Sequence, residues 1–190
     1  MTNATDSAIV SAMQAWLDNI VIGHNFCPFA KFVRQPDTIH YTVARSKDVQ
    51  DIMLALHAEC KRLDEQPDIS TTLLMVPAFN RFTGYLDMLD LAHAMLSQWQ
   101  YEGVYQLASF HPDYQFEGEP GNAPSHYTNR SPYPTLHLIR EDDITRALED
   151  YPDPEAIFER NMAVTEELGS DYFDKQLNQC IHAQQKDKPE

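Results

Sequence analysis

A cysteine at the start of a short, proline-initiated segment is the residue best placed to do chemistry in this chain. The segment spans residues 23–34, and Cys27 directly precedes Pro28 within it. Proline suits the first position of a helix, where its missing N–H costs no hydrogen bond. Cys27 would then be the N-cap, with free backbone N–H groups facing its sulfur, a setting that favours an acidic and nucleophilic thiol. The pattern indicates a nucleophilic, redox-active or metal-liganding cysteine.

Two residues from a later, proline-rich loop are candidates to assist this thiol. His111 follows one predicted strand and Asn129 precedes the next. With Cys27 as nucleophile, His111 would be the base or ion-pair partner and Asn129 would orient it, as in Cys–His–Asn sites, which are defined by geometry and not by order along the chain. The competing interpretation is that Cys27 is an inert apolar residue between Phe26 and Phe29.

A metal site is the second chemical hypothesis. His24 and Cys27 form a His-x-x-Cys pair that could bind zinc or iron, with His111, His126 or His137 completing the set. The pair alone is a weak signal, because metal sites usually show a second closely spaced pair. His137 lies in the middle of a predicted strand, where a hydrogen-bonded core histidine is the alternative.

Hydrophobic patterning predicts a scaffold of alternating strands and helices. An amphipathic helix over residues 6–22 precedes the cysteine segment, and Gly23 is predicted to end it in a left-handed conformation. Strands are predicted at 38–45, 69–77, 104–110 and 134–140, with helices at 47–65 and 84–101 between the first three. Those three strands should run parallel, with right-handed crossovers, and the fourth should run antiparallel because no helix precedes it.

The fold class predicted is therefore α/β, bordering on α+β: a single domain with a mixed four-stranded sheet packed by helices. A ferredoxin-like antiparallel sandwich is the alternative. Residues 1–169 are expected to form the domain, and residues 170–190 a C-terminal helical extension with a tail that frays over 186–190.

A ligand site is expected where the parallel strands end, because open sheets bind ligands outside the carboxyl ends of their strands. The polar residues predicted at that edge are Arg45, Arg81, His111, Asn129, Arg130 and Ser131. The chain has 14 Lys+Arg against 29 Asp+Glu, a net charge of −15, so converging arginines predict a carboxylate or phosphate ligand. The alternative for Arg45 and Arg81 is that they cap strand ends and pair with surface carboxylates.

Composition excludes several classes of partner and compartment. A surface this acidic repels nucleic-acid phosphates and anionic lipids, so neither nucleic acid nor membrane is an expected partner. The longest apolar runs fall short of the roughly 20 residues that a membrane helix needs. Residues 1–6 lack the features of a signal peptide, and Cys27, Cys60 and Cys180 are too widely spaced for a disulfide framework. A cytoplasmic location is expected, while cofactor and oligomeric state stay unknown.

Four segments carry a resemblance to a known family: residues 21–31, 109–116, 129–141 and 159–162. They resemble an uncharacterised family of bacterial and plant proteins, the domain of unknown function 1415, over nearly the whole chain to about residue 169. The resemblance implies the signature residues Asn25, Cys27, Pro28, Phe29, His111, Pro112, Asn129, Arg130, Ser131, Pro132, His137 and Arg140. It thereby adds Asn25 and Arg140 to the candidate ligand-binding residues. The position of His24 is usually apolar in this family, which counts against His24 as an obligatory metal ligand.

Three hypotheses of function follow. The first is a small-molecule enzyme, a thiol-dependent transferase or hydrolase, that uses Cys27 as nucleophile or redox thiol on an anionic metabolite. The second is a zinc or iron protein, and the third is a non-catalytic module that binds a small anion or a partner protein. The sharpest expectation is that Cys27, His111, Asn129 and Arg130 surround one pocket. Arg130 and the helix N-terminus would then lower the pKa of the Cys27 thiol below its ordinary value of about 8.5.

Overall fold

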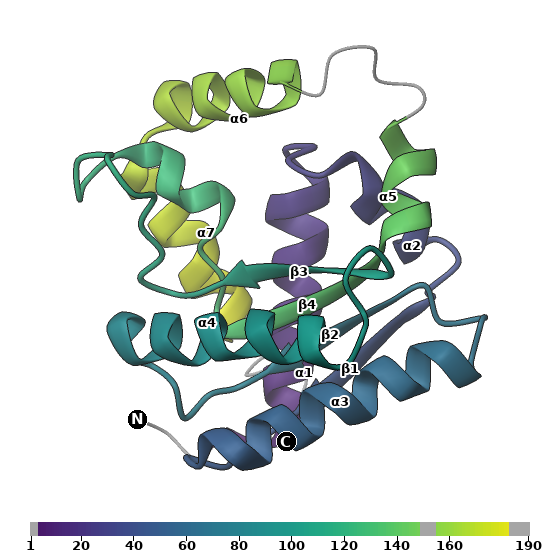
Figure 1. Cartoon of the computed structure of the whole chain (residues 1–190). Helices are drawn as coiled ribbons and strands as arrows, with labels where there is room; N and C mark the ends of the chain where they lie inside the picture. The colour runs from purple at the N-terminus through teal and green to yellow at the C-terminus, as the bar shows by residue number, and fades with distance from the viewer. Residues whose placement is uncertain (1–3, 149–154, 183–190) are drawn as a thin grey trace, which may run out of the picture.

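A four-stranded sheet forms the centre of the fold, seen in a computed structural model that describes residues 4–148 and 155–182 (Figure 1). The strands β1 (Ile39–Val43), β2 (Thr71–Met75), β3 (Tyr105–Phe110) and β4 (Thr135–Arg140) lie in the order β1-β2-β4-β3. β1 and β2 pair in parallel, and β4 pairs antiparallel with both β2 and β3. The predicted mixed α/β sheet is confirmed, and the antiparallel ferredoxin-like alternative is wrong.

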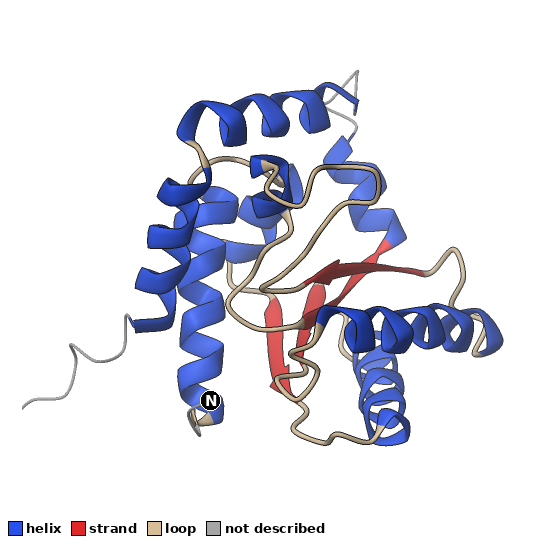
Figure 2. Cartoon of the chain, turned by 90° about the vertical axis from the view of Figure 1, so that its left-hand side faces the viewer, coloured by secondary structure: helices blue, strands red, loops and turns tan. Residues whose placement is uncertain are grey.

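Helices cover both faces of the sheet, as Figures 1 and 2 show. On one face lie α3 (Val49–Glu65) and α4 (Phe82–Gln98), the crossover helices that follow β1 and β2. On the other face lies α1 (Asp6–Trp16), which continues into the helical turn η1 (Leu17–Ile22). The remaining helical elements are α2 (Pro28–Arg34), η2 (Pro124–Thr128), α5 (Glu141–Leu148), α6 (Glu155–Leu168) and α7 (Ser170–His182).

Strand alternation divides the interior into two cores. Leu74 and Leu136 pack beneath α3 and α4, whereas their neighbour Leu73 packs against α1 and η1. Successive side chains of a strand point to opposite faces of the sheet. Residues adjacent in sequence can therefore belong to different sites, which matters for His111 below.

The first helix has the predicted length, but its last turn is a π turn and its end differs from the prediction. The N–H of Gly23 donates to the carbonyl of Asp18, five residues earlier, at 3.1 Å. Gly23 has a φ of −56°, so the predicted left-handed cap is wrong there, and Asn25 takes the positive φ of 55° instead. Gly23 is required for a different reason, since a Cβ on it would lie 2.3 Å from the carbonyl oxygen of Asn19.

Replacement of Gly23 by alanine is expected to lower the free energy of unfolding by about 1–3 kcal/mol, because the backbone must shift to admit the added methyl group. Urea denaturation of the purified variant measures this loss. Gly84→Ala is the matched control: it lies within α4 and a Cβ there meets no described atom within 4 Å, so alanine should stabilise by up to about 1 kcal/mol. Equal stability of Gly23→Ala and the unaltered chain would contradict the prediction.

The start of the predicted C-terminal extension is the helix α7, which packs against α1. Its Phe173 and Cys180 are buried in the same core as Trp16. The predicted frayed tail over 186–190 lies outside the described residues. None of the helices in the described residues combines the length and the apolar character that spanning a membrane requires.

Candidate functional site

The segment that presents Cys27 has the local structure that its sequence predicts. Cys27 is the N-cap of α2, with an extended backbone (φ −130°, ψ 113°), and Pro28 opens the helix. The preceding residue, Phe26, is tied back to the π turn by a 2.8 Å bond from its N–H to the carbonyl of Val21. The thiol therefore lies directly after a tight turn, between η1 and α2.

Two side chains of α6 hydrogen-bond to the backbone of this turn. The amide Nδ2 of Asn161 donates to the carbonyl of Phe26 at 2.7 Å, and this bond is buried. The guanidinium of Arg160 donates to the carbonyls of His24 (2.9 Å) and Asn25 (3.1 Å). Reasoning from sequence missed both residues as part of the site, although the segment 159–162 is one of those that carry the family resemblance.

Loss of the Asn161 side chain is expected to lower the free energy of unfolding by about 1–3 kcal/mol, because Asn161→Ala leaves the buried carbonyl of Phe26 without a donor. Chemical denaturation measures the loss. Arg160→Ala removes neighbouring but exposed bonds and should cost about 1 kcal/mol or less. A larger loss for Arg160→Ala than for Asn161→Ala would show that the exposed bonds, and not the buried one, hold the turn.

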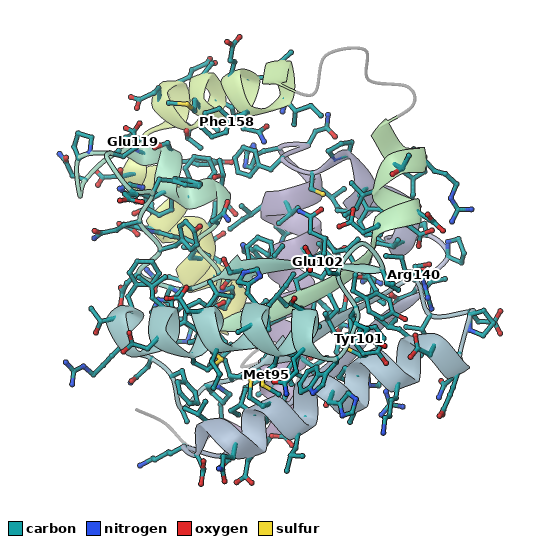
Figure 3. All side chains as sticks on the ribbon, viewed as in Figure 1. Met95, Tyr101, Glu102, Glu119, Arg140 and Phe158 are labelled. Carbon is teal, nitrogen blue, oxygen red and sulfur yellow. The ribbon has the colours of Figure 1, made fainter. Side chains whose placement is uncertain are left out.

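Cys27 lies where an open groove meets a smaller and more enclosed cavity. The groove has a volume of about 380 Å³ and is lined by Val21, Phe26, Cys27, Phe110, Phe116, Thr128, Asn129, Ile157, Phe158 and Asn161. Figure 3 marks Phe158 on α6, which forms one wall of the groove. The cavity has a volume of about 110 Å³ and is lined by Trp16, Leu17, Val21, Cys27, Ala30, Ile39, Leu73, Ala108, Phe110, His137 and Ile139. Val21, Cys27 and Phe110 line both spaces.

The thiol at this junction is less acidic than predicted. Burial raises the pKa of Cys27, and this effect outweighs the opposing one of the Phe29 and Ala30 N–H groups at the start of α2. Removal of solvent disfavours the charged form of any thiol. The predicted lowering of the Cys27 pKa is wrong in direction, and the resting group is a neutral thiol.

His111 faces the other side of the sheet from Cys27. Its Nδ1 accepts the Asp113 N–H at 3.0 Å, so its Nε2–H donates to the Phe79 carbonyl at 3.1 Å. Its ring lies 5.1 Å from that of Phe82 and 5.0 Å from that of Tyr85, both on α4. Burial lowers the pKa of His111. Both ring nitrogens are occupied, and His111 lines neither the groove nor the cavity that Cys27 lines.

At the sheet edge the structure brings together the backbones of His111 and Asn129, but it does not gather the predicted polar side chains in one place. The N–H of His111 donates to the carbonyl of Asn129 at 3.2 Å. Asn129 lines the groove, where its Nδ2 donates to the carbonyl of Ser109. The Arg130 guanidinium instead lies 4.5 Å from the centre of the Tyr127 ring, and the Ser131 hydroxyl is buried. Of the four residues expected around one pocket, the groove joins only Cys27 and Asn129.

The remaining candidate ligand-binding residues are distributed over the surface and do not form a cationic pocket within the described part of the chain. Arg45 forms an exposed ion pair with Asp6 at 2.6 Å, the alternative stated above. Arg81 is the exposed N-cap residue of α4, and Asn25 supplies the positive φ of the turn. Arg140 lies at the far end of β4, where its guanidinium donates to the carbonyls of Leu63 and Ile69 (Figure 3).

The predicted metal ligands are likewise separated. The ring of His24 packs among Phe26, Tyr172 and Phe173, and burial followed by the charge of Arg160 lowers its pKa. His126 is buried, and both of its ring nitrogens are hydrogen-bonded to the backbone of the long loop between β3 and β4, residues 111–134. Across residues 4–148 and 155–182, no three His, Cys, Asp or Glu side chains are grouped to hold a metal ion. The set His24, Cys27, His111 and His137 is not assembled.

His137 is the histidine that lines the same cavity as Cys27. Its Nε2 lies 2.8 Å from the hydroxyl of Thr71, which itself donates to the carbonyl of Leu138, so Nε2 carries the hydrogen. The other ring nitrogen, Nδ1, is buried and has no hydrogen-bond partner among the described residues. Burial lowers the pKa of His137 to about 4, so the ring is neutral at physiological pH.

The family resemblance is now supported by a direct comparison. A model of the family described as a protein of unknown function (DUF1415) matches residues 8–175. The chain belongs to the DUF1415 family. The DUF1415 match includes every residue that lines the groove and the cavity, and also Arg160 and Asn161 on α6. Comparison with curated proteins and with solved structures finds no match.

Proposed function

We propose that this DUF1415 protein is a small-molecule enzyme, a thiol-dependent transferase or hydrolase, in which Cys27 is the nucleophile. The observation that supports this most is the position of Cys27 at the junction of the groove and the cavity. Cys60 and Cys180 are buried in the helical cores, away from both spaces. A substrate in the groove would thus meet Cys27, and neither of the other two thiols.

His137 takes the role first assigned to His111. In the proposed step the Cys27 sulfur attacks an electrophilic carbon, a C–S bond forms, and the bond to the leaving group breaks. As the C–S bond forms, the thiol proton passes to Nδ1 of His137, which is neutral and is hydrogen-bonded to none of the described residues, and the departing group then takes up that proton from Nδ1. That nitrogen and the sulfur are not hydrogen-bonded at rest, and catalytic hydrogen bonds of this kind often form only when substrate binds. Asn129 lines the same groove as the thiol, and its Nδ2 has a second N–H besides the one that donates to the Ser109 carbonyl.

The electrostatics favour an uncharged substrate over the anion that the sequence suggested. Among the described residues that line the groove or the cavity there is no arginine or lysine. Burial of an unpaired anion there would be costly. The three cysteines are free thiols, which supports a reducing compartment, and we propose the cytoplasm.

Alkylation kinetics test the role of Cys27. Iodoacetamide should modify Cys27 slowly at pH 7 and faster as the pH rises above about 8.5–9, because burial raises the thiol pKa. His137→Gln should slow the reaction at neutral pH by about tenfold or more, since general bases commonly contribute 10²–10⁴-fold. Mass spectrometry of peptides gives the rate for each cysteine separately.

His111→Gln is the matched control, because it alters a buried histidine on the other face of the sheet. It should leave the rate at Cys27 within about twofold. A Cys27 that reacts no faster than Cys60 at any pH would refute the proposed enzyme and leave the non-catalytic binding module as the surviving hypothesis. An equal effect of both histidine variants would remove His137 from the mechanism.

A further inference from the structure

The small cavity beside Cys27 has the size and lining of a binding site for a short aliphatic group. Its volume is about 110 Å³, and its lining is apolar except for the Cys27 sulfur and the His137 ring. Water occupies about 30 Å³ per molecule in the liquid, so the cavity holds roughly three to four heavy atoms. Cavities with apolar walls stay dry and bind apolar guests. An alkyl group of that size could therefore occupy the cavity.

The groove on the other side of Cys27 offers polar side chains without charge. Thr128, Asn129 and Asn161 line it, together with aromatic and aliphatic residues. Val21, Cys27 and Phe110 line both the groove and the cavity, so the thiol stands between the apolar cavity and a mostly apolar groove that adds three uncharged polar side chains. A molecule that spans both spaces would place the bond between its chain and its head group at the sulfur.

From this arrangement we infer that the site takes small uncharged molecules with an aliphatic chain of three to four carbons and a carbonyl-type polar head. The chain occupies the cavity, the head lies in the groove, and the carbon that joins them faces Cys27. The position of the reacting carbon depends on the function proposed above. Binding of the ligand's aliphatic chain does not require the thiol. The cavity and the nucleophile can therefore be tested separately.

A series of straight-chain amides from acetamide to hexanamide probes the cavity, with the unreactive Cys27→Ser variant as receptor. The protein has two tryptophans, and their indole N–H resonances report on different places. Trp16 lines the cavity, whereas Trp99 is stacked on His57 at 4.4 Å, on the other face of the sheet. The Trp16 signal should shift on titration and the Trp99 signal should stay in place.

Affinity should rise roughly fourfold for each added methylene, the factor that corresponds to about 0.8 kcal/mol per buried CH₂. The rise should stop once the chain has three to four carbons beyond the carbonyl, because the cavity is then full. Butyrate should bind at least tenfold more weakly than butyramide, since none of the described lining residues is a lysine or an arginine. A Trp16 shift that does not depend on chain length, or tighter binding of butyrate, would overturn the inference.

Ala108→Ile fills the cavity from β3 and should abolish the Trp16 shift. Gln106→Ile is the matched control, because it places the same side chain on the same strand at a position that does not line the cavity. If Ala108→Ile fails to fold, Ala30→Val fills the same space from α2. Unchanged butyramide binding in the filled variant overturns the inference. If amide binding depends on chain length but Cys27 of the unaltered chain fails the alkylation test above, the binding site is supported and the proposed enzyme is refuted.

Discussion

Acidification from pH 7 to pH 4 is expected to lower the free energy of unfolding by about 3 kcal/mol through His137 alone. Burial lowers its pKa from the ordinary 6.5 to about 4 in the folded protein. Between these two values the unfolded chain binds more protons than the folded one, so stability falls as the pH falls. Each unit of pKa difference corresponds to about 1.4 kcal/mol. The loss should begin near pH 6.5 and level off below about pH 4.

Urea unfolding of the unaltered chain and of His137→Gln at several pH values isolates this contribution. Glutamine does not titrate and can still offer an N–H to the hydroxyl of Thr71. Burial also lowers the pKa of His24, His40 and His111. Acidification therefore lowers the free energy of unfolding through these residues as well, and to the same extent in both proteins. The difference between the two pH profiles belongs to His137. Parallel profiles would show that His137 is readily protonated in the folded state.

Truncation of Trp16 is expected to have the largest effect of any single substitution near the site, about 3–5 kcal/mol for Trp16→Ala. The side chain is 1% exposed, and its ring packs edge-on to Phe110 with centroids 5.0 Å apart. Its indole N–H donates to the carbonyl of Arg130 at 2.9 Å, which fastens the long loop to the first helix. Alanine would remove both the packing and the bond.

Trp16→Phe separates the two contributions, because phenylalanine retains most of the packing but has no N–H. It should cost about 1–2 kcal/mol, mainly from the unpaired carbonyl. Denaturant unfolding followed by far-ultraviolet circular dichroism measures both variants without relying on tryptophan fluorescence. If phenylalanine proved as damaging as alanine, the bond to Arg130 would stabilise the fold more than the packing does.

The features that could be predicted from sequence are those that depend on local patterns. The alternation of strands and long helices was enough to predict the direction of all four strands, because the length of a connection determines whether the strands it joins run parallel or antiparallel. Pro28 was enough for the N-cap position of Cys27, because proline restricts the start of a helix. The family membership rested on long motifs and is confirmed.

The site was predicted less well, because side-chain direction and burial depend on contacts that are distant in sequence. His111 stands one residue beyond β3, and a shift of one residue moves a side chain to the opposite face. The predicted cationic pocket is not formed among the described residues, because the arginine side chains bind other carbonyls or carboxylates near them. A long flexible side chain has many such partners within reach, so its partner cannot be predicted from sequence. The Cys27 pKa depended on a competition between a helix terminus and burial, and only the packed structure shows that burial prevails.

The π turn of η1 has a consequence for which changes of chain length the protein can accept. In the turn the Gly23 N–H bonds to a residue five positions back, so the turn holds one residue more than an α-helix would. Deletion of one residue from this turn would restore ordinary α-helical hydrogen bonding there. It would also rotate the preceding helix by about 100° relative to Cys27. Trp16 and Met13 would leave the core even though neither had been mutated. The number of residues in this turn therefore determines which side chains of the first helix face the site.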